Sequence, residues 1–408
     1  MMHRKLWIFA LLSLAATLRL TPAATPKGVL IEVDAGAHDR QNTPVFYELP
    51  EDLRSQKAFT LKRLDNNQSV DVQVESGLVP RAVWIIRDKL PSGQARRYRL
   101  TPADKSASKA AVTTEDDAKC LAVKIGNRAV LRYNEAVIPS SIPGKPEYRR
   151  SGYIHPVYDP EGRVVTDDMA PDHAHQHGIM FPYEKVKLQD RHLNFWEPSN
   201  GTISHDRTES AVSGQVFGGF RVALRHDEND LPGGLQPVLR EAWEVHVYNI
   251  SDYFLFDLVS VQNCATGTPV LIEKNIYGGA AIRCNRNWFD HPNESEYLTS
   301  EGKTRADGDQ TRPRWVDLYG LIDGKASGVA IMDHPTNFRF PQPVRLHPQK
   351  PYFCFSPMAL DSFSIEPGRP YVSRYRYYIH VGKPDAAKIE ALWHDYAEPV
   401  QVRIVRTN

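Results

Sequence analysis

Short segments rich in valine, isoleucine, leucine and tyrosine run along nearly the whole chain, each bounded by glycine, proline, asparagine or aspartate. The first group of residues fits the pleated, half-buried surface of a β-sheet, and the second favours turns. The 30 prolines and 25 glycines are spread between the segments, as frequent turns require. The pattern predicts an all-β chain with antiparallel sheets. Its strands are expected within residues 28–35, 45–49, 69–76, 82–88, 95–102, 120–127, 129–134, 210–226, 239–249, 253–264, 269–284, 315–323, 327–335 and 371–382.

A polar stretch from Thr101 to Ala118 divides the chain, and its composition is that of a linker or exposed loop. We therefore predict a small N-terminal β-sandwich over residues 25–110, a linker and first strand over 111–129, and a large antiparallel β-sandwich over 130–383. Residues 384–408 are expected to form one C-terminal helix and a tail. The helix is indicated by apolar residues at helical spacing, namely Ile389, Leu392, Trp393 and Tyr396.

Residues 1–24 have the order of parts of a cleavable secretory signal peptide. The basic head His3-Arg4-Lys5 precedes an apolar run over 6–18, and Ala23 and Ala24 offer small residues for cleavage. That apolar run is shorter than the roughly 20 residues that a membrane-spanning helix needs. We expect a periplasmic or secreted protein without a membrane span.

Charge and cysteine spacing exclude several classes of partner. The formal net charge is +1, and it becomes −2 without residues 1–24, which hold three basic and no acidic residues. This near balance argues against a nucleic-acid partner. No two cysteines are spaced as in a C-x-x-C metal or redox motif. We expect buried free thiols at Cys120, Cys264, Cys284 and Cys354, with a Cys264–Cys284 disulfide as the alternative.

The densest chemical signal lies between residues 167 and 178, where three histidines alternate: His173, His175 and His177. Alternate residues of an extended strand face one side, so the three imidazoles are expected to project together. Imidazole is both a common metal ligand and the usual general acid or base near neutral pH. Either role remains open: acid–base catalysis, or a divalent metal held by these histidines and completed by a carboxylate of Asp167, Asp168 or Asp172.

A second candidate is Tyr277, which precedes a pair of glycines and, further on, Arg283. Paired glycines let a backbone approach a ligand closely, or simply form a β-bulge. An arginine on the same segment can bind a carboxylate or hydroxyl group. We therefore add Tyr277 and Arg283 to the candidate catalytic residues.

Three further places could line a substrate pocket. Asp333 and His334 stand at the end of an expected strand, where they either face a pocket or cap a turn. Glu241 shares a strand face with Trp243, whose contact would desolvate the carboxyl group and raise its pKa. Trp196 offers an aromatic face for a sugar ring, although most aromatic residues of a β-protein belong to its core. We predict a catalytic role for His334 and substrate binding for Asp333, Glu241 and Trp196.

Several segments, read together, resemble one family of bacterial domains. These are YIHPVYDPEGRVVTDD, DHAHQHGIMF, NFWEPSNGTISH, YGGAAIR and SGVAIMDHPTNFR. In this order they resemble the family named "methane oxygenase PmoA-like", over about residues 130–383. The family's histidine segment reads approximately D-H-P-H-H-R-G. His173 and His175 match it, whereas Gln176 and His177 depart from it, and His155, Tyr277, Arg283 and His334 fall on other motif positions.

The resemblance implies a fold and a setting, but not the activity in the family's name, because this chain lacks the transmembrane helices of a methane monooxygenase subunit. It implies a β-supersandwich like those of sugar mutarotases and some polysaccharide lyases, in a bacterium that degrades polysaccharides. It adds His155 to the expected substrate-binding residues.

We expect a secreted or periplasmic carbohydrate-active enzyme of the hydrolase or lyase type, with a glycan or oligosaccharide as its partner. The alternatives are a metal-dependent oxidoreductase built on the same histidines and a non-catalytic glycan-binding protein. A glycosidase normally needs two carboxylates at a defined separation. The sequence indicates no such pair, and this favours a lyase, an epimerase or a metal-assisted hydrolase.

Overall fold

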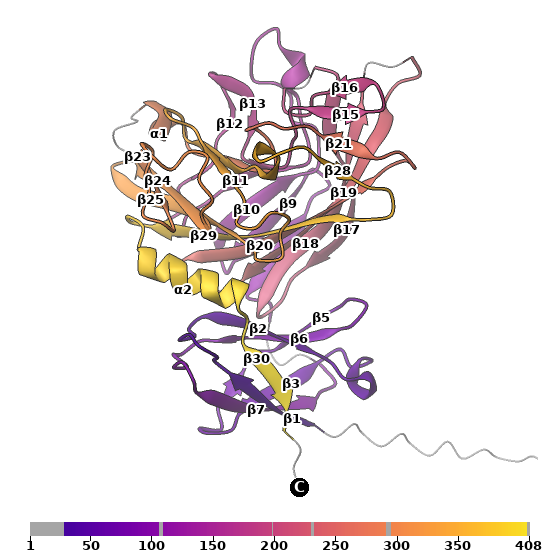
Figure 1. The fold of residues 1–408 in the computed structure, drawn as a ribbon. Coiled ribbons are helices and arrows are strands. Elements are labelled where there is room, and N and C mark those ends of the chain that lie inside the picture. The colour runs from indigo at the N-terminus through magenta and orange to yellow at the C-terminus, as the bar shows by residue number, and fades with distance from the viewer. Residues whose placement is uncertain (1–27, 106–108, 198, 230–231, 291–294, 406–408) are drawn as a thin grey trace, which may run out of the picture.

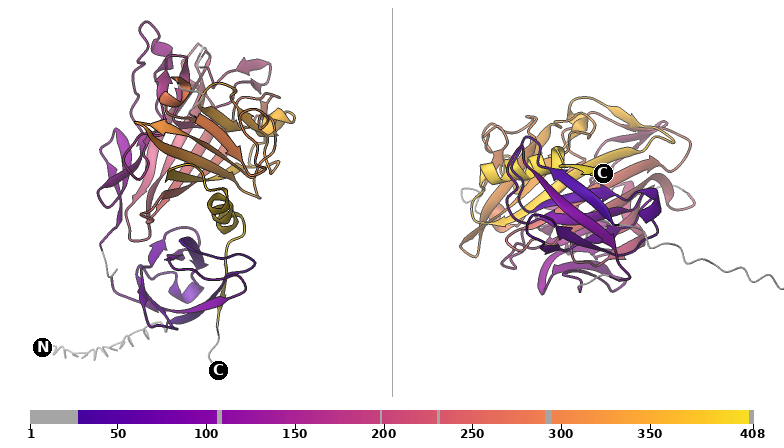
Figure 2. Two further views of the ribbon diagram at one scale, coloured as in Figure 1. Left: turned by 90° about the vertical axis from the view of Figure 1, so that its left-hand side faces the viewer. Right: turned by 90° about the horizontal axis from the view of Figure 1, so that it is seen from below.

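The computed structural model describes residues 28–105, 109–197, 199–229, 232–290 and 295–405. These form a small and a large β-rich unit, with helix α2 (Ala386–Ala397) between them (Figures 1 and 2). The predicted all-β class, with a small and a large sandwich and one long C-terminal helix, is confirmed. The predicted signal peptide lies outside the described residues. No helix among the described residues is long and apolar enough to cross a membrane.

The small unit consists of two facing antiparallel sheets around the buried Ile31, Val45, Trp84 and Leu100. One sheet has the order β30 (Gln401–Ile404), β1 (Val29–Asp34), β7 (Ala95–Pro102), β3 (Phe59–Arg63), β4 (Ser69–Val70). The other has the order β2 (Thr43–Glu48), β6 (Arg81–Ile86), β5 (Gln73–Glu75). The alternating burial of β7 shows why these strands form: Arg96, Tyr98 and Leu100 are buried and the residues between them are exposed.

The large unit contains two eight-stranded antiparallel sheets that share one core. The first has the order β17 (Gly201–Val212), β18 (Phe217–Glu228), β19 (Gln236–Tyr248), β20 (Phe254–Cys264), β29 (Tyr371–Val381), β25 (Lys325–Asp333), β24 (Trp315–Ile322), β23 (Ser295–Thr299). The second has the order β26 (Val344–Leu346), β27 (Tyr352–Phe355), β22 (Ala280–Arg283), β14 (Ile179–Met180), β11 (Tyr153–Val157), β10 (Arg128–Asn134), β9 (Cys120–Ile125), β8 (Val112–Asp116).

Two smaller sheets lie at the end of the large unit that is remote from the small one (Figure 1). One is the hairpin of β12 (Asp168–Ala170) and β13 (His173–His177). The other has the order β16 (Arg191–Leu193), β15 (Val186–Leu188), β21 (Val270–Ile272), β28 (Phe363–Ile365). The remaining elements are short: α1 (Asn287–Asp290) and the 3₁₀ turns Glu51–Leu53, Pro146–Tyr148 and Pro357–Ala359.

Helix α2 begins where the side chain of Asp385 accepts a hydrogen bond from the Lys388 backbone amide. Its apolar face buries Ile389, Leu392 and Trp393 against the large unit. On the other side, Asp395 pairs with the buried Arg40 over 3.1 Å and accepts from Thr43 over 2.8 Å, so the helix connects both units.

Two regions have more structure than the sequence indicated. Residues 111–129, expected to hold a linker and a first strand, contain β8 and β9, which are both strands of the large unit. The expected C-terminal tail contains β30, which pairs with β1. All four cysteines are free thiols, and the alternative Cys264–Cys284 disulfide is absent. Cys284 and Cys354 are buried as predicted, whereas Cys120 and Cys264 are partly exposed.

Candidate functional site

The three alternating histidines lie on β13, which is an extension of a core strand. After His177 the chain passes through Gly178 into β14, between β11 and β22 of the large unit. A Cβ atom at Gly178 would collide with the carbonyl oxygen of Ile154, and its φ is +28°, so only glycine fits here. The rigid sheet therefore fixes the position of the histidines.

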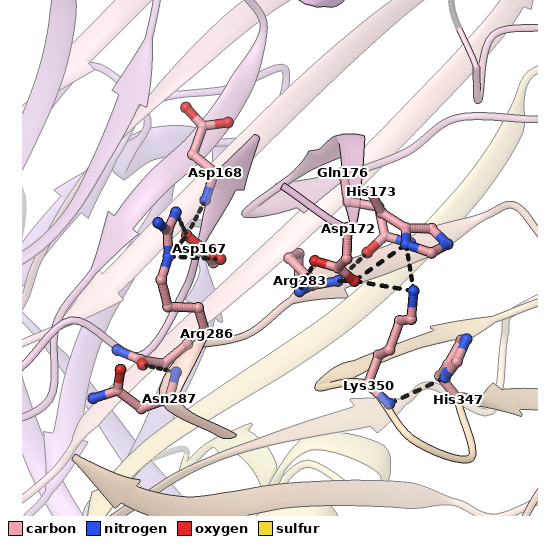
Figure 3. Close-up of polar contacts among 11 residues, drawn as sticks. Asp167, Asp168, Asp172, His173, Gln176, Arg283, Arg286, Asn287, His347 and Lys350 are labelled. Atoms are coloured by element: carbon pink, nitrogen blue, oxygen red, sulfur yellow. Dashed lines mark hydrogen bonds and ion pairs between the residues drawn. The ribbon is translucent and has the colours of Figure 1, made fainter. Parts of the chain in front are cut away.

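His173 is the most accessible of the three, with 30% of its side chain exposed. Its Nδ1 lies 2.7 Å from Nζ of Lys350 and 3.1 Å from Oδ2 of Asp172 (Figure 3). The lysine ammonium can only donate, so at the shorter contact Nδ1 accepts and Nε2 carries the proton of a neutral imidazole. Burial and then the charge of Lys350 lower the pKa of His173, against the opposing effect of Asp172.

Asp172 is the centre of a charged network beside His173 (Figure 3). Arg283 donates to both of its carboxylate oxygens, over 2.8 and 3.1 Å, and Lys350 lies 3.1 Å away. Burial raises the pKa of Asp172, but the hydrogen bonds from Arg283 and the contact with Lys350 outweigh it and hold this pKa well below its usual range. Asp172 is therefore an anion that positions its neighbours.

Arg283, which we expected to bind substrate, lies on β22 with a side chain that is completely buried. Besides its two hydrogen bonds to Asp172, Arg283 donates one to Oε1 of Gln176 over 2.9 Å. Nη1 and Nη2 of Arg283 are thus occupied by protein groups, whereas its buried Nε has no hydrogen-bond partner among the described residues, and Arg283 acts through Asp172. The pair of glycines before β22 has a structural reason as well, because a Cβ atom at Gly279 would collide with the carbonyl oxygen of Phe355.

His175 is buried beside Trp196, with ring centroids 5.8 Å apart, and its ring lies 5.2 Å from that of His173. Burial, with smaller effects of His173 and His177, lowers the pKa of His175 to about 3. Trp196 was expected to stack on a sugar. It is 4% exposed and packs among His175, Tyr277 and Tyr352, so protein side chains cover its ring.

His177 is buried and His155 is half-buried. Nδ1 of His177 is 2.6 Å from Oδ1 of Asp168, whose other oxygen accepts from the Tyr153 hydroxyl over 2.7 Å. Burial lowers the pKa of His177, and the hydrogen bond to Asp168 only partly opposes this. His155 places Nδ1 2.9 Å from the Thr166 hydroxyl, and burial lowers its pKa too. Both imidazoles are bound to protein groups through Nδ1.

Side chains that the sequence analysis did not single out complete the wall around His173. The turn between β26 and β27 supplies Lys350 and His347, whose ring lies 6.2 Å from that of His173. Burial and the charge of Arg345 lower the pKa of His347 to about 4. Arg345 itself donates to the hydroxyl of Tyr277 over 3.3 Å. No local motif marks these residues, because they reach His173 only through the pairing of distant strands.

The three histidines of β13, which the sequence offered as alternative metal ligands, do not form a preformed metal site. Within the described part of the chain, the groups of three or more His, Cys, Asp or Glu ligand atoms within 4.8 Å of one another are His38–His394–Glu398 and Glu75–Glu244–His246. His173, His175 and His177 do not form such a group. A divalent metal on β13 would require these side chains to rearrange.

Three of the expected residues lie outside this face. The side chain of Glu241 is fully buried, 2.7 Å from Nε2 of His226, and accepts from Trp243, Ser260 and Gln262. Asp333 is buried as well and accepts from Asn337 and the Gln342 amide. The ring of His334 packs on Tyr396 of α2, with centroids 4.7 Å apart, at the opposite end of the large unit from β13 (Figure 1). Packing and buried hydrogen bonds account for all three.

Comparisons with known proteins identify a family but no activity. Residues 120–394 match the model of a family described as of unknown function, DUF6807. Similar solved structures include a protein in glycosyl hydrolase family 38 from Enterococcus faecalis and an alpha-mannosidase from Enterococcus faecalis V583. Both are 10% identical, with a TM-score of 0.48, and the matches cover 94% and 93% of this chain. They cover 48% and 46% of those chains, so this chain spans about half their length. No curated protein matches it by sequence.

Proposed function

This chain belongs to the family of unknown function DUF6807, and we propose that it is a carbohydrate-active enzyme of the hydrolase or lyase type. The observation that carries the proposal is the setting of His173: a neutral, partly exposed imidazole held between Lys350 and Asp172. A positioned imidazole that is neutral at physiological pH is suited to proton transfer. The predicted signal peptide supports a location outside the cytoplasm, where glycans are available.

In the proposed reaction, the glycosidic C–O bond breaks as His173 gives the proton on Nε2 to the departing oxygen. In a hydrolysis, a water oxygen binds the carbon that loses this oxygen; in an elimination, the electron pair of a neighbouring C–H bond forms a C=C bond. Lys350 passes a proton to Nδ1, so the imidazole stays neutral, and the proton released by the water or the C–H bond returns the Lys350 amine to an ammonium through solvent. Figure 3 shows the second ring nitrogen of His173 pointing away from Lys350. Asp172 and Arg283 keep the pair in place.

The residues around His173 fit the two-carboxylate mechanism of a glycosidase less well. Asp172 is engaged by Arg283 and Lys350, and the other nearby carboxylate, Glu197, is largely exposed, 3.8 Å from Nδ1 of His175. A general acid of a glycosidase must instead hold a proton near neutral pH. The imidazole-centred site therefore favours elimination over hydrolysis by two carboxylates.

The proposal is tested by incubating the chain without residues 1–24 with a panel of plant and algal oligosaccharides and detecting products by mass. Cleavage with an unsaturated end indicates a lyase, and cleavage with added water a hydrolase. His173→Ala is expected to lower kcat/KM roughly 10²- to 10⁴-fold, the usual contribution of a general acid or base. His192→Ala, which changes a side chain that is 66% exposed, is the matched control and should retain activity.

Other results would favour the alternatives. Binding of a glycan without any turnover would make the protein a binding module. Stoichiometric iron or copper in the purified chain, together with oxidised sugar products, would indicate the oxidoreductase. Full activity of His173→Ala would contradict the assignment of His173.

A further inference from the structure

Arg150 is a buried arginine without a carboxylate partner. The described residues include five buried arginines, and four of them lie within 4.0 Å of an acidic oxygen: Arg40, Arg96, Arg283 and Arg376. Arg150 is 8% exposed and has no such contact within the described residues, and its Nε and Nη2 have no hydrogen-bond partner there. This distinguishes it from the arginines that stabilise the fold.

The nearest carboxylates are already engaged. Asp168 and Glu241 act on Arg150 only through longer-range attraction. Asp168 binds His177 and Tyr153, and Glu241 binds His226. Burial lowers the pKa of Arg150 to about 10, which still leaves it a cation at neutral pH. A buried charge with two unpartnered nitrogens is costly, so an acceptor from outside the chain would be bound favourably here.

A small cavity borders Arg150. Its lining includes Arg149, Arg150, His177, Phe195 and Thr202, and Arg149 is exposed at the surface. The cavity volume is about 10 Å³, close to the space that one water molecule needs. It therefore admits a single oxygen of a larger ligand, whose remaining part would stay outside.

The cavity adjoins β13, the strand that carries His173, His175 and His177. His177 lines it, and the other two histidines follow on the same strand, with His173 at the far end. Four residues of a strand span about 13 Å, which is the separation along β13 between His177 at the cavity and the partly exposed His173. Residues 174–177 are buried, so a ligand would reach the cavity from the side of the exposed Arg149. Phe195 of the cavity is also next to Trp196, which packs on His175.

We propose that Arg150 binds an anionic oxygen of the glycan, from the carboxylate of a uronate or from a sulfate ester, with the sugar chain on the side of Arg149. The nature of this ligand rests on the proposed function, whereas anion binding at Arg150 does not depend on turnover. A guanidinium is well suited to either group, because its planar fork matches carboxylate and sulfate-like oxygens.

The test measures binding in the His173→Ala background, where turnover cannot interfere. Oligosaccharides of equal length that carry uronates, sulfate esters or neither are titrated by calorimetry, with and without Arg150→Met. We expect one anionic series to bind tighter than the neutral one, and Arg150→Met to weaken it roughly 10- to 100-fold, as for a lost hydrogen bond to a charged group. The series that responds identifies uronate or sulfate. If the ratio of the affinities for anionic and neutral oligosaccharides is the same with and without Arg150, the proposal is wrong.

A second readout separates a binding arginine from a structural one. Without ligand, Arg150→Met should leave Tm unchanged or raise it, because it removes a buried charge that lacks a partner. Arg40→Met, which leaves Asp395 without its arginine, is the matched control and should lower Tm. A loss of Tm in Arg150→Met as large as in Arg40→Met would contradict the proposal. If no glycan is turned over but the anion preference depends on Arg150, the enzyme assignment fails and this inference stands.

Discussion

His175 is held neutral in the folded chain, since burial against Trp196 lowers its pKa to about 3. In the unfolded chain the pKa returns to about 6.5. Between these pH values the unfolded state binds one proton more than the folded state, so the free energy of unfolding falls as the pH drops from about 6.5 to about 3. One residue can thereby contribute up to about 5 kcal/mol of acid sensitivity.

We expect His175→Gln to reduce this sensitivity, because glutamine does not titrate. The loss of unfolding free energy between pH 7 and pH 4 should be smaller by about 3 kcal/mol than in the unchanged chain. Urea unfolding at both pH values measures it, and His192→Gln on an exposed side chain is the control. An equal loss in all three proteins would show that His175 does not titrate as described.

The sequence predicts part of the residue-scale geometry. Alternation along a strand placed the histidines on one face, and the rings of His173 and His175 do lie 5.2 Å apart. It does not predict their partners, because Arg283 is 111 residues from Asp172 and Lys350 is 177 residues from His173. Such contacts depend on which strands pair, and that is decided by packing of the whole core.

At the scale of one element, the sequence correctly placed Glu241 and Trp243 on one face of β19, but the structure gives Glu241 a role in the core and not in substrate binding. Glu241 and Glu244 are three residues apart on β19 and face opposite sides of the strand: Glu241 is buried, whereas Glu244 is half-buried beside Arg221. Burial of Glu241 with Trp243 was foreseen, but not the donors that surround it. His226, Ser260 and Gln262 come from neighbouring strands and make its carboxylate part of the core.

Glu241→Ala is therefore expected to destabilise the protein by roughly 3–5 kcal/mol, because it leaves buried donors without their acceptor. Glu244→Ala, which removes a largely solvated ion pair, should cost no more than about 1 kcal/mol. Denaturant unfolding of both variants gives the comparison. A loss of glycan turnover in Glu241→Ala at unchanged stability would instead restore Glu241 as a substrate-binding residue.

At the scale of the whole molecule, the strand pattern predicted an all-β chain with two sandwiches, because two-residue periodicity and turn residues are local signals. The strand order is not local. In the second large sheet β14 lies between β11 and β22, whose sequence positions differ by more than a hundred residues. This strand order is determined by packing of the apolar faces of the two large sheets against each other in one core. The same holds for β30, which is too short and polar to be recognised before its pairing with β1 is known.

Because the C-terminal strand β30 pairs with β1, the stability of the small unit depends on the C-terminal end of the chain. β30 covers the edge of β1, and Arg403 of this strand pairs with Glu32. Val402 of β30, together with the preceding Val400, packs on the core of the small unit. A chain ending at Glu398 would keep α2 but lose these contacts. Two partly buried valines and an uncovered edge should cost the small unit about 2–4 kcal/mol.

We expect this truncation to lower the first unfolding transition in calorimetry and to expose residues 28–105 to proteolysis, while the large unit keeps its own transition. Arg403→Ala is the control: its side chain is 65% exposed, so loss of the ion pair with Glu32 should leave both transitions nearly unchanged. If truncation and control behave alike, the pairing of β30 with β1 adds no stability. If both transitions fall together, the two units unfold as one cooperative body, with α2 transmitting the loss from the small unit to the large one.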